Sequence, residues 1–227
     1  PVAVALEAQL GRIPASLGFV EAGSLPKVAL TSYKALVWYA GAPFAARWTR
    51  PDSTVLVLGG SGGTGTTGIQ LARAFGAKYI TTTTSADNFD YCRALGANRT
   101  IDYRTTDWWD DSIVDADSVD VIYDTVGEAG TGDRAMTKLR DGGFYVTIVG
   151  AVASSTRPGR GQAMFINSDT NLASAPLMDA LGSLADAGSL RMPKIDSSFG
   201  IDEIEKAFAR SRTGQVVGKI SVVPKTS

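Results

Sequence analysis

A glycine-dense run in the first third of the chain limits the fold more than any other feature. It reads Gly59-Gly60-Ser61-Gly62-Gly63-Thr64-Gly65 and lies between an apolar stretch at 54–58 and a helix-like stretch at 66–75. Glycines at this spacing permit a tight turn, close approach of the backbone to a pyrophosphate, and close packing of a helix on its strand. The helix start would offer free N–H groups to the anion. Turns of this type also occur with nothing bound, so the run alone leaves the ligand open.

Strand-like and helix-like segments alternate through the middle of the chain. The runs at 54–58, 119–123 and 144–149 are almost continuously apolar, which is typical of strands buried in a parallel sheet. Alternation of such strands with helices indicates right-handed βαβ units. The sequence therefore predicts an α/β fold, a Rossmann doubly wound parallel sheet with helices on both faces. Further strands are expected at 79–83 and 100–103, helices at 88–95 and 132–139, and a turn at 141–143.

The predicted helix at 66–75 has a distinct apolar face, on which Gly68 would allow close contact with the sheet. The last part of the chain carries elements that look appended to this sheet. Helices are expected there at 176–186 and 202–210, and strands at 191–195 and 218–223. The polar, Pro- and Gly-rich segment 153–162 is expected to be a surface loop, with a lid as the alternative.

The composition excludes several classes of function. Lys plus Arg (22) almost balance Asp plus Glu (23), so nothing favours nucleic acid or an anionic membrane as a partner. No apolar run approaches the roughly 20 residues of a membrane span. The absence of histidine and the single cysteine, Cys92, remove the usual zinc clusters and the Ser-His-Asp and Cys-His machinery, so no metal is expected. We expect the side chain of Cys92 to be packed in the interior and chemically inert. We expect the protein to be in a reducing compartment such as the cytosol or an organelle matrix.

Ordered motifs along nearly the whole chain carry a family resemblance. They are Ala22-Gly23-Ser24-Leu25-Pro26, Leu30-Thr31-Ser32-Tyr33-Lys34-Ala35-Leu36, Val55-Leu56-Val57 with the glycine run, Ala94-Leu95-Gly96-Ala97, Ile101-Asp102-Tyr103, Tyr123-Asp124-Thr125-Val126-Gly127 and Gly218-Lys219-Ile220. Their order and spacing resemble the medium-chain dehydrogenase/reductase superfamily, in its zinc-free quinone oxidoreductase (zeta-crystallin-like) branch. No single motif is decisive, but together they indicate that the glycine run evolved as part of a nucleotide-binding site.

The resemblance implies a domain organisation in which part of the usual protein is missing. Members of the branch carry an N-terminal GroES-like substrate domain, of which only a final strand near 2–13 is expected here. Residues 1–21 would be a remnant of that domain, 22–175 the dinucleotide-binding Rossmann domain, and 176–227 elements that return toward the substrate domain. The chain would be a piece of a longer protein or a shortened paralogue. The strand edges and apolar faces that it would otherwise expose favour the first.

The end of the second strand bears on which dinucleotide is bound. An NAD site has an acidic residue about 20 residues beyond the glycines, which binds the ribose hydroxyls and repels a 2′-phosphate. Here no carboxylate appears before Asp87, and Thr84, Ser85 and Asn88 offer donors to a phosphate. NADPH is therefore expected over NADH. No Lys or Arg lies in this stretch, which predicts modest affinity, and a Thr-rich strand end beside an empty pocket is the structural alternative.

The resemblance also assigns residues to parts of the cofactor. Thr31 would lie at the nicotinamide end and Tyr103 at the adenosine end. The structural alternatives are a helix cap for Thr31 and a filled strand edge for Tyr103. Gly63 and Thr64 would lie at the pyrophosphate, and the rim of the cleft would be formed by apolar residues that are otherwise plain core. The full set of expected contacts is Thr31, Gly62, Gly63, Thr64, Gly65, Thr84, Ser85, Asn88, Tyr103, Val126, Ile148 and Val149.

No side chain has the pattern of a poised proton donor, and Tyr33, Tyr39 and Tyr145 are candidates by residue type only. In the branch that this chain resembles, hydride passes from the nicotinamide to an activated alkene or a quinone, and the protein contributes orientation and a dry cleft. Enoyl-thioester reductases of the family take an acidic tyrosine from the N-terminal domain. Catalytic residues are therefore left unassigned, and the expected substrate is a small or thioester-linked quinone, enone or enoyl compound.

Two other interpretations stay open. The chain would alternatively be a non-catalytic nucleotide-binding or structural subunit that retains the fold within a larger assembly. A short-chain dehydrogenase also fits the glycine run, but that family needs Tyr-x-x-x-Lys, which this sequence lacks. The resembled family commonly dimerises through the edge formed by its last Rossmann strand, expected here near 164–167.

Overall fold

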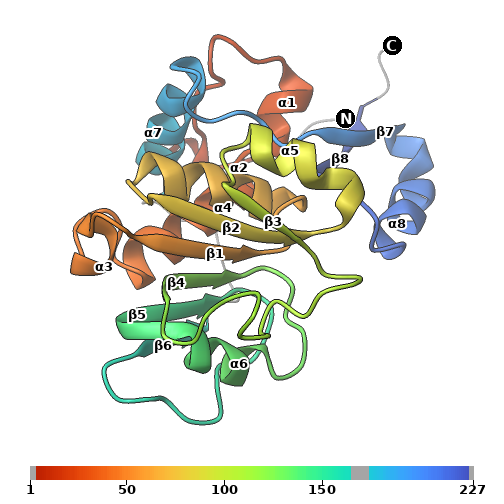
Figure 1. Cartoon of the computed structure of the whole chain (residues 1–227). Coiled ribbons are helices and arrows are strands. Elements are labelled where there is room, and N and C mark those ends of the chain that lie inside the picture. The colour runs from red at the N-terminus through yellow and green to blue at the C-terminus, as the bar shows by residue number, and fades with distance from the viewer. Residues whose placement is uncertain (1–3, 165–173, 225–227) are drawn as a thin grey trace.

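The computed structural model describes residues 4–164 and 174–224 and contains a sheet of six parallel strands. The strand order is β3-β2-β1-β4-β5-β6, so the chain starts in the middle of the sheet, builds one half, and then crosses back to build the other (Figure 1). This is the doubly wound order, and it confirms the predicted fold class. The strands are β1 Thr54–Leu58, β2 Tyr79–Thr84, β3 Arg99–Asp102, β4 Val119–Asp124, β5 Leu139–Thr147 and β6 Gly161–Met164.

Side chains of the central strand enter two separate cores, one on each face of the sheet. Val55 and Val57 belong to the first core, and Leu56 and Leu58 to the second. Burial on both faces explains why the strand is apolar at every one of these positions. The first core is covered by α2 (Pro26–Tyr33), α4 (Gly63–Ala74), α5 (Phe89–Ala94) and α7 (Ser174–Asp186), and the second by α6 (Thr131–Lys138), as Figure 1 shows.

Helix α4 packs closely on the sheet through a glycine, as the sequence predicts. A Cβ at Gly68 would lie 2.9 Å from the ring of Tyr123 in β4, so a larger residue would push the helix outward. Leu71 and Ala72, on the same face, are fully buried. The helix begins at Gly63 rather than at the predicted position 66, because its first turn is built from the glycine run itself.

The turn expected at 141–143 is an irregularity inside a longer strand. Val119 pairs with Leu139 and Val121 with Phe144, so β5 bulges between these positions and then resumes its pairing with β4. Gly142 has a φ of +77°, which favours glycine and explains the turn-like sequence. The predicted turn is wrong as a separate element, because 141–143 belong to β5, which begins further toward the N-terminus than expected.

A second, two-stranded parallel sheet lies beside the first one. It consists of β7 (Ile195–Gly200) and β8 (Lys219–Val223), joined by a short 3-10 turn at Ile201–Glu203 and by α8 (Ile204–Arg212). The strand expected at 191–195 is wrong, because β7 only begins at Ile195. The backbone N–H and C=O of Arg191 bond instead to the side-chain amide of Gln70, at 2.7 and 3.0 Å, which satisfies them without a neighbouring strand.

The predicted N-terminal strand is also wrong within residues 4–13, where the structure has one 3-10 turn, Glu7–Gln9, and no strand. A strand needs a neighbour with which to form backbone hydrogen bonds, and none of the described strands pairs with this segment. It is held instead by α7, since the backbone N–H groups of Arg12 and Ser16 donate to Asp179 and Asp186. The remaining short elements are α1 Phe19–Ser24, a π-helical extension of α2 at Lys34–Tyr39, α3 Ala46–Thr49 and a 3-10 turn Ala86–Asn88.

The polar segment 153–160 is a loop, and the end of the predicted loop, from Gly161, forms the edge strand β6. Met164 lies at this edge and is 48% exposed, whereas positions 165–167 of the expected dimer edge lie outside the described residues. Among the helices of the described ranges, none has the length and apolar character needed to cross a bilayer.

Cys92 is fully buried in α5, which confirms its predicted packing. Burial raises the pKa of its thiol to about 11, against a smaller opposing effect of a contact with Thr84. At pH 8 roughly one thiol in a thousand would then be the reactive thiolate. We expect iodoacetamide to leave the native protein unlabelled at pH 8 and to label one site per chain in 6 M guanidinium, as measured by intact mass. Rapid labelling of the native protein would contradict this packing.

Candidate functional site

The glycine run forms the connection from β1 to α4, at the carboxyl end of the central strand. Gly62 takes the N-cap position, and none of the described side chains caps the helix. The first N–H groups of a helix have no acceptor within it, and they carry the positive end of the helix dipole. The start of α4 is therefore open to an anionic group.

Two positions in the run have no room for a side chain. A Cβ at Gly65 would lie 2.1 Å from the carbonyl oxygen of Gly59, and a Cβ at Gly60 would lie 2.1 Å from the hydroxyl of Thr82. Gly59 itself has a φ of +82°, in the left-handed region. The tight turn expected from the sequence is confirmed, and its backbone is bare on the side where a ligand would approach.

A cavity of about 380 Å³ opens beside this turn. It lies at the carboxyl ends of β1, β2 and β4, where the strand order reverses, which is the usual position of a ligand crevice in a doubly wound sheet. Four of the predicted contacts line it: Gly62, Thr84, Tyr103 and Val126. The sequence prediction missed several other lining residues, namely Leu58, Gly59, Ser61, Thr83, Trp108, Thr125, Glu128, Thr131, Gly214 and Val216.

The other predicted contacts do not line this cavity. Gly63, Thr64 and Gly65 lie in the first turn of α4, and Ile148 and Val149 follow β5. Thr31 is buried in α2, where its hydroxyl donates to the backbone carbonyl of Lys27 at 2.7 Å rather than capping a helix. The assignment of these residues to parts of a cofactor remains a prediction.

The polar groups at the end of β2 are bonded to one another. The hydroxyl of Thr84 donates to that of Ser61 at 2.8 Å, and the amide of Asn88 donates to the hydroxyl of Ser85 at 2.9 Å. Both Thr84 and Ser85 are buried. A phosphate at this position would have to displace Ser61 from Thr84, so that donor is less free than the sequence suggests, whereas the hydroxyl of Ser85 accepts from Asn88 and can still donate.

The C-terminal segment lies against the glycine turn between β1 and α4, a contact that the sequence did not predict. The backbone N–H of Gly218 donates to the carbonyl of Ser61 at 2.9 Å, and Gly218 forms a parallel bridge with Gly62. Gly218 has a φ of +79°, and a Cβ there would lie 2.0 Å from the carbonyl oxygen of Lys194. The motif at 218–220 is visible in the sequence, but its contact with a turn so distant in the chain is not.

The next residue, Lys219, brings a cation to the start of α4. Its half-buried stem lies against Gly63, since a Cβ at Gly63 would be 2.6 Å from the Cδ of Lys219. An ammonium group beside the positive end of a helix dipole is unfavourable unless an anion lies between them. The pairing of Lys219 with the bare helix start therefore suits a pyrophosphate.

A buried carboxylate organises the opposite side of the cavity. Asp124 ends β4, is completely buried, and accepts the backbone N–H groups of Val126 and Gly127 at 2.9 and 3.0 Å. Its second oxygen accepts the hydroxyls of Tyr145 and Thr147 at 2.9 and 3.1 Å. The loop after β4 is thereby joined to the end of β5, where the hydroxyl of Thr147 also accepts the backbone N–H of Gly150 from the following loop at 2.8 Å. These two loops carry Val126 and Val149, which are 58% and 55% exposed.

None of the three tyrosines considered as proton donors lines the cavity. Tyr145 donates to Asp124, and burial together with that neighbouring carboxylate raises the pKa of Tyr145 far above its usual range. Tyr33 packs edge-on against Phe75, with 6.0 Å between ring centroids, and Tyr39 ends the π-helical extension of α2. The structure thus gives no reason to assign a catalytic role to any of them.

The donor set does not fit a zinc ion. Within residues 4–164 and 174–224, no group of three or more His, Cys, Asp or Glu side chains could hold a metal. The sequence has no histidine, and its single thiol is enclosed in the first core. We therefore derive no step that passes through a metal in this part of the protein.

Comparison with known proteins gives consistent matches. A family model described as zinc-binding dehydrogenase matches residues 95–222. The chain is 32% identical to the 2-methylene-furan-3-one reductase of Solanum lycopersicum over 93% of its length, and 30% identical to the chloroplastic NADPH-dependent alkenal/one oxidoreductase of Arabidopsis thaliana over 93%. These matches cover 48% and 49% of the two relatives, so the chain spans about half their length. The quinone oxidoreductase structure from Coxiella burnetii superposes with a TM-score of 0.73 at 27% identity, over 94% of this chain and 62% of that one.

Proposed function

Since the chain belongs to the zinc-binding dehydrogenase family, within the medium-chain dehydrogenases/reductases, we propose that it is the nucleotide-binding part of an NADPH-dependent reductase. The substrate class that we propose is an alkene conjugated to a carbonyl group, with quinones and enoyl thioesters as close alternatives. Relatives named for an alkenal/one and a methylene-furanone support the first, and a structure named as a quinone oxidoreductase supports the second. We also propose that hydride transfer needs no metal, since the described donor set does not fit one.

The observation that carries this proposal is the bare, uncapped start of α4 beside a cavity at the point where the strand order reverses. In our proposal the backbone N–H groups at 63–65 and the ammonium of Lys219 hold the pyrophosphate. Tyr103 lies at the adenosine end, and Val126 with Val149 keeps water from the nicotinamide end. When bound, NADPH would supply the hydride. The residues described here would bind and orient it. The same proposal includes the division of the chain into a substrate-domain remnant (1–21), a dinucleotide-binding domain (22–175) and a C-terminal part (176–227).

A second candidate is a nucleotide-binding subunit without chemistry of its own. It is favoured by one observation: the three tyrosines considered as proton donors, Tyr33, Tyr39 and Tyr145, do not line the cavity. Both candidates predict NADPH binding, and turnover separates them.

The test is a titration of the full encoded protein with NADPH, followed by nicotinamide fluorescence, with Lys219→Met as the variant. Methionine keeps the stem that packs on Gly63 and removes the charge, so we expect the Kd for NADPH to rise about tenfold. Lys206→Met is the matched control, because Lys206 is an exposed lysine on α8 that pairs with Glu203, and its Kd should not change.

Failure of both NADPH and NADH to bind the unmodified protein would refute the nucleotide site. Binding without oxidation of NADPH by quinones, enones or enoyl thioesters would favour the second candidate. Equal affinity of the Lys219→Met and unmodified proteins would remove Lys219 from the proposed site and leave the rest of it in place.

A further inference from the structure

A cation lies at the adenosine end of the cavity, on a residue that the sequence analysis did not single out. Arg104 directly follows Tyr103, and its guanidinium carbon is 5.9 Å from the centroid of that ring. One guanidinium nitrogen is 3.7 Å from the carboxylate of Asp87, and another donates to the side chain of Gln215 at 3.1 Å. Tyr103 lines the cavity, as do the two neighbours of Gln215 in the chain. Arg104 therefore lies next to residues that line the cavity and joins the residues after β2 to the C-terminal segment, without being part of the lining itself.

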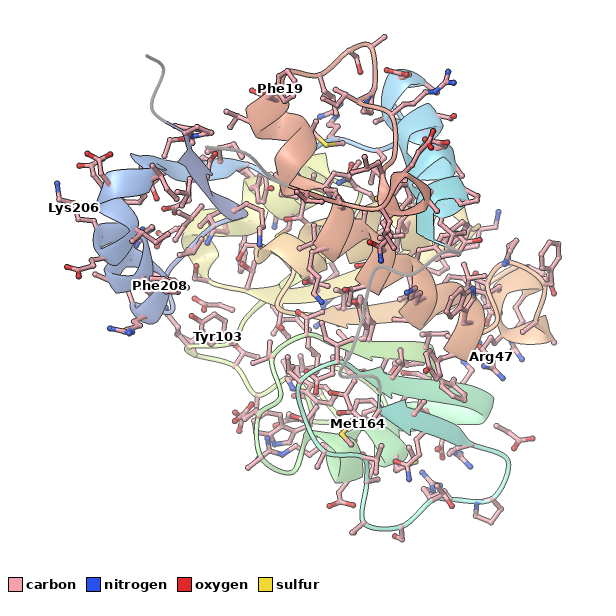
Figure 2. All side chains as sticks on the ribbon, turned by 180° about the vertical axis from the view of Figure 1, so that it is seen from behind. Phe19, Arg47, Tyr103, Met164, Lys206 and Phe208 are labelled. Atoms are coloured by element: carbon pink, nitrogen blue, oxygen red, sulfur yellow. The ribbon has the colours of Figure 1, made fainter. Side chains whose placement is uncertain are left out.

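Figure 2 shows Tyr103 at the side of the molecule that also carries α8 with Phe208, away from Arg47 at the opposite end. Tyr103 is 54% exposed, so the cavity is open to solvent at this point. A ligand group at the adenosine end would meet the ring of Tyr103 and the guanidinium of Arg104 together.

The residues after β2 do not supply the positive charge that a 2′-phosphate needs. Such a group carries about −1.5 to −2 charges at pH 7. The stretch 79–88 contains no Lys or Arg, the hydroxyl of Thr84 already donates to Ser61, and its one acidic residue, Asp87, would repel a phosphate. Preference for NADPH therefore requires a cation from another part of the chain.

We propose that Arg104 is the residue that selects NADPH over NADH, by exchanging its contact with Asp87 for the 2′-phosphate. The inference rests on the proposed function and adds the residue that sets its cofactor specificity. The existing ion pair is easily exchanged, because it is 3.7 Å long and its side chains are 46% and 85% exposed. A guanidinium binds phosphate through paired, charge-assisted hydrogen bonds that are much stronger.

Arg104 also acts through the charge of Asp87. While Arg104 is present, it compensates this carboxylate at the adenosine end. Without it, the carboxylate of Asp87 would stand alone near the ribose, which is the arrangement that favours NADH and repels a 2′-phosphate. Loss of Arg104 should therefore lower the affinity for NADPH and leave that for NADH almost unchanged.

The chain offers a closely matched control for this residue. Arg93 pairs with the exposed carboxylate of Asp90 at 3.3 Å, and its guanidinium carbon is 5.4 Å from the ring centroid of Phe89. It thus makes the same two kinds of contact as Arg104, but it lies on α5 and lines a different cavity. Arg93→Ala removes the same charge from the protein at a position where we expect no effect on cofactor binding.

The experiment measures Kd values for NADPH and NADH by fluorescence titration, and for 2′,5′-ADP and 5′-ADP by calorimetry. The full encoded protein is compared with Arg104→Ala, Arg93→Ala, Asp87→Asn and the double variant Arg104→Ala with Asp87→Asn. We expect Arg104→Ala to raise the Kd for NADPH and 2′,5′-ADP at least tenfold and that for NADH and 5′-ADP less than twofold. Asp87→Asn should tighten NADPH binding, and should recover part of the loss in the double variant.

The results separate the inference from the function on which it rests. If the unmodified protein bound neither dinucleotide, the proposed function would fall, and the inference with it. If it bound both, and Arg104→Ala weakened both to the same extent, Arg104 would support the local structure and the specificity role would be overturned. Unchanged NADPH affinity in Arg104→Ala would also overturn it, with the nucleotide site left intact.

Discussion

Replacement of Gly65 by alanine should abolish NADPH binding and destabilise the fold. The new Cβ would lie 2.1 Å from the carbonyl oxygen of Gly59 and 2.8 Å from the Cα of Gly60, which are backbone atoms of the same turn and cannot rotate away. Either the turn must open or α4 must move off the sheet. Overpacking of this kind costs roughly 2–4 kcal/mol of unfolding free energy. The displaced helix start should weaken NADPH binding by at least about fiftyfold, since both anion contacts depend on its position.

Gly62→Ala is the matched control for this prediction. Its Cβ would lie 3.4 Å from the same carbonyl oxygen, an ordinary contact, and Gly62 has a φ of −71° that alanine adopts freely. We expect the urea midpoint of Gly62→Ala to stay close to that of the unmodified protein. Any change in its affinity for NADPH would then come only from the added methyl group beside the cofactor. A Gly65→Ala protein with an unchanged midpoint and an unchanged Kd for NADPH would contradict the structure of the turn.

The sequence predicts those parts of the fold that depend on local or periodic signals. Leu56 and Val57 are on opposite faces of β1 and are both buried, so after Thr54 every position of the strand is apolar. Gly68 is visible as a small residue on the inner face of a helix, and it does face Tyr123. Such features are encoded by neighbouring residues, and the doubly wound order then follows from the alternation of strands and helices.

The features that the sequence does not reveal depend on partners far along the chain. Arg191 looks like the start of a strand, yet its backbone is satisfied by the side chain of Gln70. Gly218 is recognisable as part of a motif, but its bond to Ser61 joins two residues that are far apart in the sequence. Arg104 reads as an ordinary polar residue after a strand until Gln215 is placed beside it. In each case a side chain or backbone group from a distant element decides the local role.

Asp124, in the interior of the site, is another residue whose role the sequence does not reveal. As part of the motif at 123–127 it resembles the family, but nothing in the sequence indicates that one carboxylate collects two donors from the loop after β4 and two from β5. The two loops touch directly, because a Cβ at Gly127 would lie 3.0 Å from the backbone nitrogen of Gly150. The positions of the exposed Val126 and Val149 are therefore set by a residue that does not line the cavity.

Asp124→Ala should be the most destabilising single substitution among the polar residues of the site. It leaves two backbone N–H groups and two buried hydroxyls without their acceptor, which costs roughly 3–5 kcal/mol of unfolding free energy. We expect a correspondingly lower urea midpoint. Any folded Asp124→Ala protein should also bind NADPH more weakly, because the loops that carry Val126 and Val149 lose their common anchor.

Asp124→Asn separates the hydrogen bonds from the charge. Its remaining oxygen can still accept both backbone N–H groups, and its amide can donate to the hydroxyls of Tyr145 and Thr147, which are able to turn and accept. The loss should then be only about 1–2 kcal/mol. Because the neighbouring carboxylate helps to raise the pKa of Tyr145, that pKa should fall in Asp124→Asn, as followed by ultraviolet titration of the phenol.

The control for both variants is Asp133→Ala. Asp133 also accepts a backbone N–H and a hydroxyl, both from Ser154, at 2.8 and 2.7 Å, but it does so at the surface, where water replaces the lost acceptor. Its urea midpoint should match that of the unmodified protein. If Asp124→Ala unfolded no more easily than Asp133→Ala, the four donors would have other acceptors in solution, and Asp124 could not be what holds the two loops at the rim of the cavity.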